Sequence, residues 1–163
     1  MMSLIFLVLL TLLAVSAMHG TILQERMAGN TRDRMLAFQA TEAALRSAET
    51  TLGNSGLPSG AGIYMVPGTS PAANYTSTQQ WDTSYPWTTS AASMTSGSIS
   101  GVALQPLYVI ERLTTTAPAG CSGAGGSIQF PPPPGKGYFR ITSRGVGATT
   151  NASVILQEIY VRC

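Results

Sequence analysis

Few side chains in this chain of 163 residues could carry chemistry, and they are scattered along it. The chain has one histidine, His19, two cysteines, Cys121 and Cys163, and seven carboxylates. The cysteines lack the close spacing of a zinc knuckle, so we expect no metal site. No convergent set of acid, base and nucleophile can be named, and no glycine-rich loop lies between a strand and a helix as nucleotide binding requires. We therefore expect no catalytic residue, no cofactor and no enzyme activity.

The composition excludes two further classes of protein. Charged residues make up 10% of the chain and hydrophobic residues 44%, with a mean hydropathy of +0.18. A typical soluble domain has about 25% charged residues. The net charge of +2 is too weak for a nucleic-acid-binding surface. An intrinsically disordered chain would have lower hydrophobicity and higher net charge.

Residues 1–18 form an apolar stem that only Ser3, Thr11 and Ser16 interrupt. A helix without a polar face must be buried on every side, in lipid or in protein, and 18 residues span about 27 Å. A cleaved signal peptide is one interpretation, but no basic residue precedes the apolar run. The others are a plain membrane anchor and a helix that leaves the membrane to pack against copies of itself.

Residues 19–53 continue the helix as an amphipathic segment. They contain no proline and many good helix formers, and Gly53 and Pro58 supply stop signals. Larger apolar residues recur at near-heptad spacing beside a face of small ones: Met35, Phe38, Leu45 and Leu52, then Ala37, Ala40, Ala44 and Ala48. We predict one long helix over residues 1–53.

Two glycines, Gly20 and Gly29, lie inside this predicted helix, each costing about 1 kcal/mol relative to alanine. They are either tolerated helix residues or a weak point at which the helix bends or unwinds. We place the weakest part of the helix between His19 and Gly29.

Residues 54–163 form the predicted globular head, which includes a Ser/Thr-rich loop region at 67–101. Asp82 is the one charged residue between Thr50 and Ile110. The aromatic residues of this stretch form either a local core or an exposed platform for a ligand; they are Trp81, Tyr85 and Trp87. Asn74 and Asn151 match the N-glycosylation pattern, with unmodified surface asparagines as the alternative.

Strand patterns concentrate in the predicted C-terminal sheet, residues 106–163. β-branched and aromatic residues indicate strands at 106–113, 137–147 and 153–163, with a hairpin at 147–151 and a further short strand at 62–66. An antiparallel sheet with one apolar face needs a covering layer, which the second half of the long helix provides. The expected fold class is α+β.

The two cysteines are then candidates for one disulfide. In a chain with an export stem, a Cys121–Cys163 bond implies an oxidising compartment. Two free thiols are the alternative.

Both ends of the chain resemble type IV pilins. Residues 23–49, LQERMAGNTRDRMLAFQATEAALRSAE, are similar to the segment typical of PilX-like minor pilins. The tail also resembles theirs, with YVIERL and then YFRITSRGVGATTNASVILQEIYVR. The resemblance covers roughly residues 3–53 and 106–162.

The resemblance implies a structural subunit of a type IV pilus-like filament. Such a subunit waits in the inner membrane, is assembled by the pilus machinery, and then lies in an extracellular filament with copies of itself or other pilins. It is either a minor, assembly-initiating pilin or the main subunit. The alternatives are a membrane-anchored periplasmic binding module and a type II secretion pseudopilin. The residues expected to pack in the filament core are Met1, Leu4, Ile5, Phe6, Leu7, Leu9, Leu10, Leu12, Leu13 and Val15.

The sequence departs from the pilin pattern at the start of the stem. Pilins usually carry Glu at mature position five and often Pro near position 22, whereas this chain has Ile5 and Gly20. The absence of a basic leader suggests a processed chain. No acidic residue precedes Glu25, so a buried amino terminus must pair with another pilin's Glu, be deprotonated, or bond to oxygens such as those of Ser3 and Thr11. The absence of a carboxylate in the stem favours the minor, assembly-initiating role.

Overall fold

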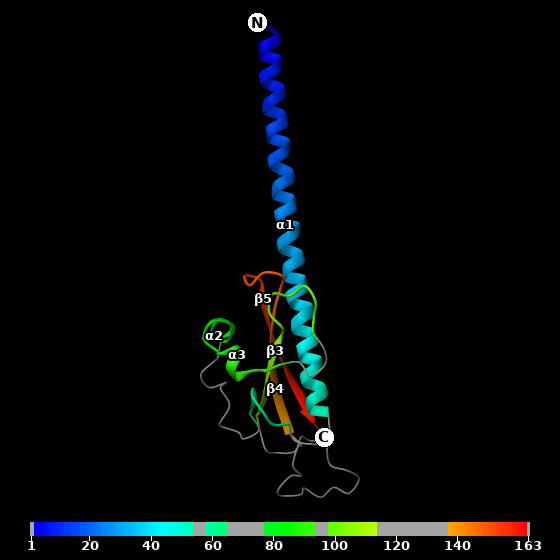
Figure 1. Cartoon of the computed structure of the whole chain (residues 1–163), viewed down its shortest axis with the longest axis vertical. Helices are drawn as coiled ribbons and strands as arrows, with labels where there is room; N and C mark the ends of the chain where they lie inside the picture. The colour runs from blue at the N-terminus through cyan, green and yellow to red at the C-terminus, as the bar shows by residue number, and fades with distance from the viewer. Residues whose placement is uncertain (1, 54–57, 65–76, 94–97, 114–136, 163) are drawn as a thin grey trace, which may run out of the picture.

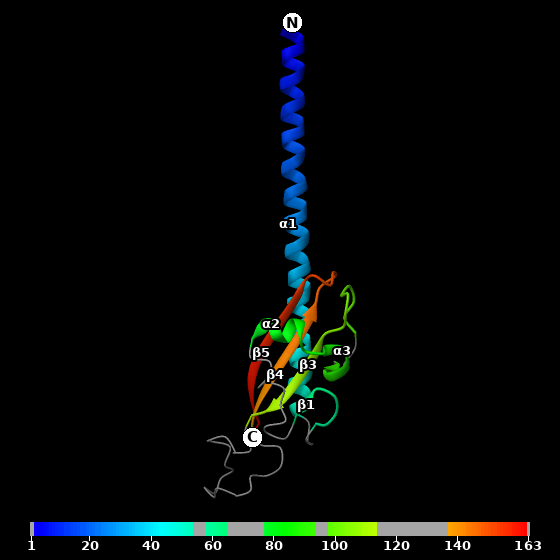
Figure 2. The same cartoon turned by 90° about the vertical axis from the view of Figure 1, so that its left-hand side faces the viewer.

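The computed structural model describes residues 2–53, 58–64, 77–93, 98–113 and 137–162. A long helix runs from the N-terminus into a small head (Figure 1). Seen from the side, the strands form a sheet with this helix behind it and two short helices in front (Figure 2). This confirms the expected α+β fold. The elements in chain order are α1 (Met2–Gly53), β1 (Ile63–Tyr64), α2 (Thr78–Thr83), α3 (Trp87–Ser90), β2 (Ala92–Ser93), β3 (Leu107–Arg112), β4 (Gly137–Val146) and β5 (Ser153–Arg162).

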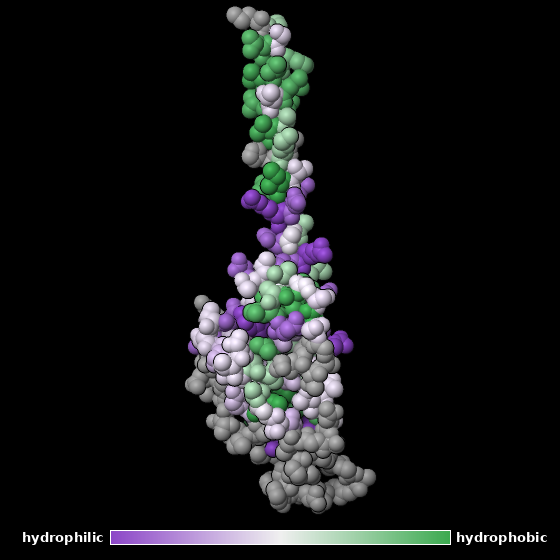
Figure 3. Space-filling model, in the orientation of Figure 1, coloured by the Kyte–Doolittle hydropathy of each residue, from purple (hydrophilic) through white to green (hydrophobic). Residues whose placement is uncertain are grey.

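The helix α1 has two halves that differ in their surroundings. Wherever the structure describes the side chain, residues 2–32 are exposed, and Asp33 is the first residue of α1 that the head partly covers. The projecting half is therefore about 47 Å long at 1.5 Å per residue. Figure 3 shows that its outer part is apolar and that polar side chains gather nearer the head.

The sheet has the strand order β1-β3-β4-β5, with β2 also paired to β3. The three long strands are antiparallel neighbours, and each begins and ends within one residue of its predicted bounds where the structure describes it. The predicted short strand at 62–66 appears as β1, but it runs parallel to β3. The sheet is therefore mixed, because the chain crosses through α2, α3 and β2 before it reaches β3.

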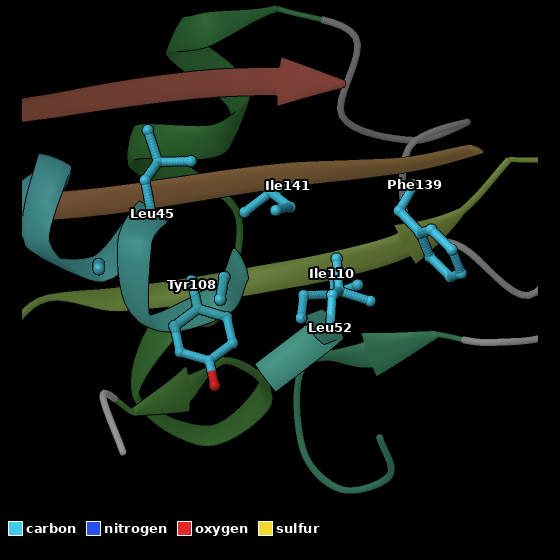
Figure 4. Close-up of a cluster of buried hydrophobic side chains, with 8 residues drawn as sticks. Leu45, Leu52, Tyr108, Ile110, Phe139 and Ile141 are labelled. Atoms are coloured by element: carbon cyan, nitrogen blue, oxygen red, sulfur yellow. The ribbon is translucent and has the colours of Figure 1, made fainter. Parts of the chain in front are cut away.

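The main core lies between the second half of α1 and the sheet (Figure 4). The residues at near-heptad spacing do not share one environment: Leu45 and Leu52 are 8% and 0% exposed, but Met35 and Phe38 are 60% and 47% exposed. The sheet packs on Leu45 and Leu52 together with the small residues of α1, whose short side chains allow the helix to approach closely. The core cluster consists of Ala44, Leu45, Ala48, Leu52, Tyr108, Ile110, Phe139 and Ile141.

A second, smaller core covers the opposite face of the sheet. Trp81, Tyr85 and Trp87 pack together on Val109, with ring centroids 4.9 to 5.8 Å apart. The indole Nε1 of Trp87 donates to the carbonyl oxygen of Trp81 at 2.5 Å. These aromatic side chains are at most 5% exposed, so they form a local core and offer no exposed platform for a ligand.

Asp82 fixes this aromatic layer to the sheet. Its Oδ1 accepts hydrogen bonds from Nε of Arg144 at 3.2 Å and from Oγ of Ser153 at 2.8 Å. Asp82, the lone charged residue of this stretch, therefore connects α2 to β4 and to the start of β5.

The Ser/Thr-rich region, expected to be loop, contains α2 and α3 because its aromatic residues dock on the sheet. The Ser77–Gln80 capping box at the start of α2 was a sequence signal for that helix.

Candidate assembly surface

The apolar stem has no packing partner in the described part of the chain. Every predicted filament-core residue that the structure describes is at least half exposed, from Val15 at 53% to Leu13 at 67%. Met1 lies outside the described residues. These side chains lie together on the projecting first half of α1, which we call the rod. They are Leu4, Ile5, Phe6, Leu7, Leu9, Leu10, Leu12, Leu13 and Val15.

This part of α1 is long and apolar enough to cross a membrane, and none of its most apolar window is buried in the head. The segment meets the length and hydropathy of a membrane span, and a signal sequence near the N-terminus has the same two properties. A continuous run of exposed apolar side chains of this length is unusual on a soluble monomer and marks a surface that contacts lipid or protein. The stem therefore requires lipid or other protein around it.

Residues 19–32 of α1 lie between the apolar stem and the head, and we call them the neck. The neck contains Gly20 and Gly29. The helix α1 is continuous through both positions. A Cβ atom added at either one would meet no other atom within 4 Å. The weak point between His19 and Gly29 therefore stays a prediction for the assembled filament.

We expect Gly29→Ala to strengthen the neck by about 1 kcal/mol, because alanine favours the helix and no neighbour obstructs its methyl group. Slower amide hydrogen exchange over residues 25–33 of the detergent-solubilised chain would show the effect. Gly53→Ala, at the far end of α1, is the matched control and should leave the neck unchanged. Equal exchange in the Gly29 variant and the wild type would contradict a weak point at this glycine.

Asp33 joins α1 to the hairpin between β4 and β5 at the point where the helix leaves the head. Its carboxylate accepts hydrogen bonds from the backbone N–H groups of Ala148 and Thr149, at 2.5 and 3.2 Å, and from the hydroxyl of Thr149 at 2.5 Å. We call this contact the Asp33 clasp. Sequence reasoning missed it, because the partners are more than 110 residues apart in the chain.

The clasp lowers the pKa of Asp33 below its ordinary value of 3.8. The hydroxyl of Thr149 is the main cause; partial desolvation opposes it, and the two backbone N–H groups add to it. A carboxylate with a lowered pKa stabilises the folded state above its unfolded pKa, and this contribution is lost as the pH falls through the folded pKa. The clasp therefore stabilises the fold at neutral pH and weakens in acid.

We expect Asp33→Ala to speed amide exchange at Ala148 and Thr149 at neutral pH, since three hydrogen bonds are lost. The difference from the wild type should vanish when the pH falls below the folded pKa of Asp33. Thr149→Val, which removes one of the three donors, should have a smaller effect. Unchanged exchange at neutral pH in the Asp33 variant would show that the carboxylate does not hold the hairpin.

Two glycines at the end of β4 allow α1 to lie directly on the strand. A Cβ atom at Gly145 would lie 2.5 Å from Thr41 Oγ1 and 2.6 Å from both the Ala37 carbonyl oxygen and the Thr41 backbone nitrogen. A Cβ atom at Gly147 would collide with Asp33. The hydroxyl of Thr41 donates to the Ala37 carbonyl at 2.7 Å and lies 3.2 Å from the Val154 carbonyl. The direction of the rod relative to the head is thus set where helix backbone meets strand backbone.

The remaining predicted site residues are separate from this surface. Asn151 is exposed in the β4–β5 turn. Asn74, Cys121 and Cys163 lie outside the described residues, so the glycosylation and the disulfide remain predictions. Within the described ranges, no group of three or more His, Cys, Asp or Glu could hold a metal ion.

An apolar rod that continues into the covering helix of a small α+β head is the architecture of a pilin. Comparison with protein families supports this class over the length of the chain. Residues 1–46 match the PilX N-terminal family, and residues 46–162 match the family described as type IV pilus assembly protein PilX, C-terminal part. The chain belongs to the PilX family of type IV pilus assembly proteins. No curated protein and no solved structure is significantly similar to it.

Proposed function

We propose that this protein is a minor, assembly-initiating subunit of a type IV pilus and that it enters the filament through its apolar stem. The observation that carries the proposal is the exposure of an apolar half-helix that projects from a folded head. Before assembly the stem would lie in the inner membrane. After assembly it would pack among the stems of other pilins, with the head on the outside of the filament.

The energetics of this transfer constrain the partners. An apolar helix gains little hydrophobic energy on moving from lipid into a helix bundle, so close packing must drive association. The first 24 residues contain no acidic side chain. In a homopolymer, the apolar core would then lack a carboxylate to pair with a buried amino terminus, which is costly when unpaired. A copy inserted beside other pilins could use a carboxylate of theirs.

The main filament subunit is a second candidate, because the neutral Ser/Thr-rich stretch suits a densely packed fibre. Purified surface filaments analysed by mass spectrometry would distinguish the two roles. A trace of the 17.0 kDa chain is the expected result. A dominant 17.0 kDa chain would instead identify the main subunit. Its absence from filaments, with retention in the membrane, would favour an anchored periplasmic module, or a secretion pseudopilin if its loss impairs secretion rather than piliation.

A further inference from the structure

Glu158 occupies an unusual position for a carboxylate, on the side of β5 that faces α1. Its neighbours two residues away, Leu156 and Tyr160, pack against the main core beneath α1. Because side chains alternate along a strand, Glu158 lies on the same face as these two. Its Oε1 atom is buried and has no hydrogen-bond partner among the described residues.

The part of α1 that faces Glu158 presents two more carboxylates. Glu42 and Glu49 are seven residues, or about two turns, apart on one flank of the helix, and both are half-buried. Both act electrostatically on Glu158, and Glu49 also approaches it as a hydrogen-bond partner. Three acidic groups therefore converge at the contact between helix and edge strand.

Among the cations near this contact, Arg46 pairs with Glu42 on the exposed side of α1. Nη2 of Arg46 forms an ion pair with Oε2 of Glu42 at 3.7 Å, and the pair is weak because the Arg46 side chain is 79% exposed. The residue of β4 opposite Glu158 is the apolar Ile141. Arg112 and Arg162 share the α1-facing side of the sheet by strand alternation, and each has interactions of its own.

We propose that Glu158, Glu49 and Glu42 form a proton-dependent contact that holds β5 against α1 when Glu158 is protonated and loosens when it ionises. The contact is a property of the subunit itself and does not depend on its role in the filament. It is confined to the β5 edge, because the packing of α1 on β4 at Gly145 and Thr41 involves no titratable group.

The sign of the pH effect follows from the surroundings of Glu158. Burial is the main cause that raises its pKa above the ordinary 4.5, and the charge and hydrogen bond of Glu49 and the charge of Glu42 add to it. A carboxyl group with a raised pKa contributes stability that is present below its unfolded pKa and is lost as the pH rises through its folded pKa. This pH dependence is opposite in direction to that of the Asp33 clasp, which lies at the turn between β4 and β5.

Amide hydrogen exchange of the full-length chain in detergent micelles tests the proposal, with peptides covering residues 42–53 and 153–162. Rates are measured from pH 4.5 upward and corrected for the intrinsic pH dependence of exchange. In the wild type, protection of β5 should fall by up to about tenfold for each unit by which the folded pKa exceeds the unfolded one. Glu158→Gln, which resembles the protonated acid, should remove this fall.

Two further variants keep the test decisive. Glu49→Gln removes one repelling charge and should reduce the fall in protection, so it carries the comparison if Glu158→Gln does not fold. Glu25→Gln changes an exposed carboxylate of the neck and should behave as the wild type. A pH dependence of β5 exchange that is equal in the wild type and in the folded Glu158 or Glu49 variant would overturn the proposal.

Discussion

Gly145→Ala should destabilise the head by about 2–3 kcal/mol, the upper part of the range for overpacking a filled site. The added methyl carbon would meet a backbone oxygen and a backbone nitrogen of α1 at 2.6 Å, and neither can move without lifting the helix from β4. Denaturant unfolding of the detergent-solubilised chain, followed by fluorescence of the buried tryptophans, measures the loss. Thr41→Ala should not rescue the variant, since it removes the hydroxyl but leaves both backbone contacts.

Gly53→Ala is the matched control for this prediction. Gly53 ends the same helix, is exposed, and has no neighbour within 4 Å of an added Cβ atom. Its replacement should change the free energy of unfolding far less than the Gly145 variant does. If the two variants proved equally stable, the close approach of α1 to β4 would be incidental to the fold.

A chain that begins at Gln24 should be soluble and monomeric without detergent, and it should be absent from filaments. The deletion removes the exposed apolar stem and leaves the part of α1 that covers the sheet, together with both cores. Analytical ultracentrifugation measures the state of association. Mass spectrometry of sheared filaments from cells that express the truncated chain measures incorporation.

A full-length chain with the same stem residues in shuffled order is the control for the truncation. It retains membrane affinity, which depends on composition, but loses the specific packing that filament entry would require. Retention in the membrane without entry into filaments is the expected result. A truncated chain that still aggregates in detergent-free buffer would contradict the view that the stem drives association.

The Asp33 clasp at the β4–β5 turn and the proposed Glu158 contact in the middle of β5 respond to pH in opposite directions. Acid should release the hairpin at Asp33 while it strengthens the contact between β5 and α1 at Glu158. The head is therefore connected to its rod by two titratable contacts, and the non-titrating packing at Gly145 lies between α1 and β4.

Local patterns in the sequence were enough to predict the rod and the sheet. The long helix, the three main strands and the α+β class follow from uninterrupted helix-forming residues and from β-branched alternation, both of which are short-range signals. The family resemblance rested on residues 23–49 and on the C-terminal strands, and the matches to both PilX families agree with it.

Only the tertiary structure decided which side of α1 is buried. The sequence contains two adjacent stripes, and the sheet buries the four alanines together with Leu45 and Leu52, because Gly145 and Gly147 leave room for α1 to lie directly on β4. Likewise, Trp81, Tyr85 and Trp87 could have been a platform or a core until the opposite face of the sheet provided Val109 beneath them. Asp33 and Glu158 acquire their roles from partners more than a hundred residues away along the chain, and no local pattern encodes such contacts.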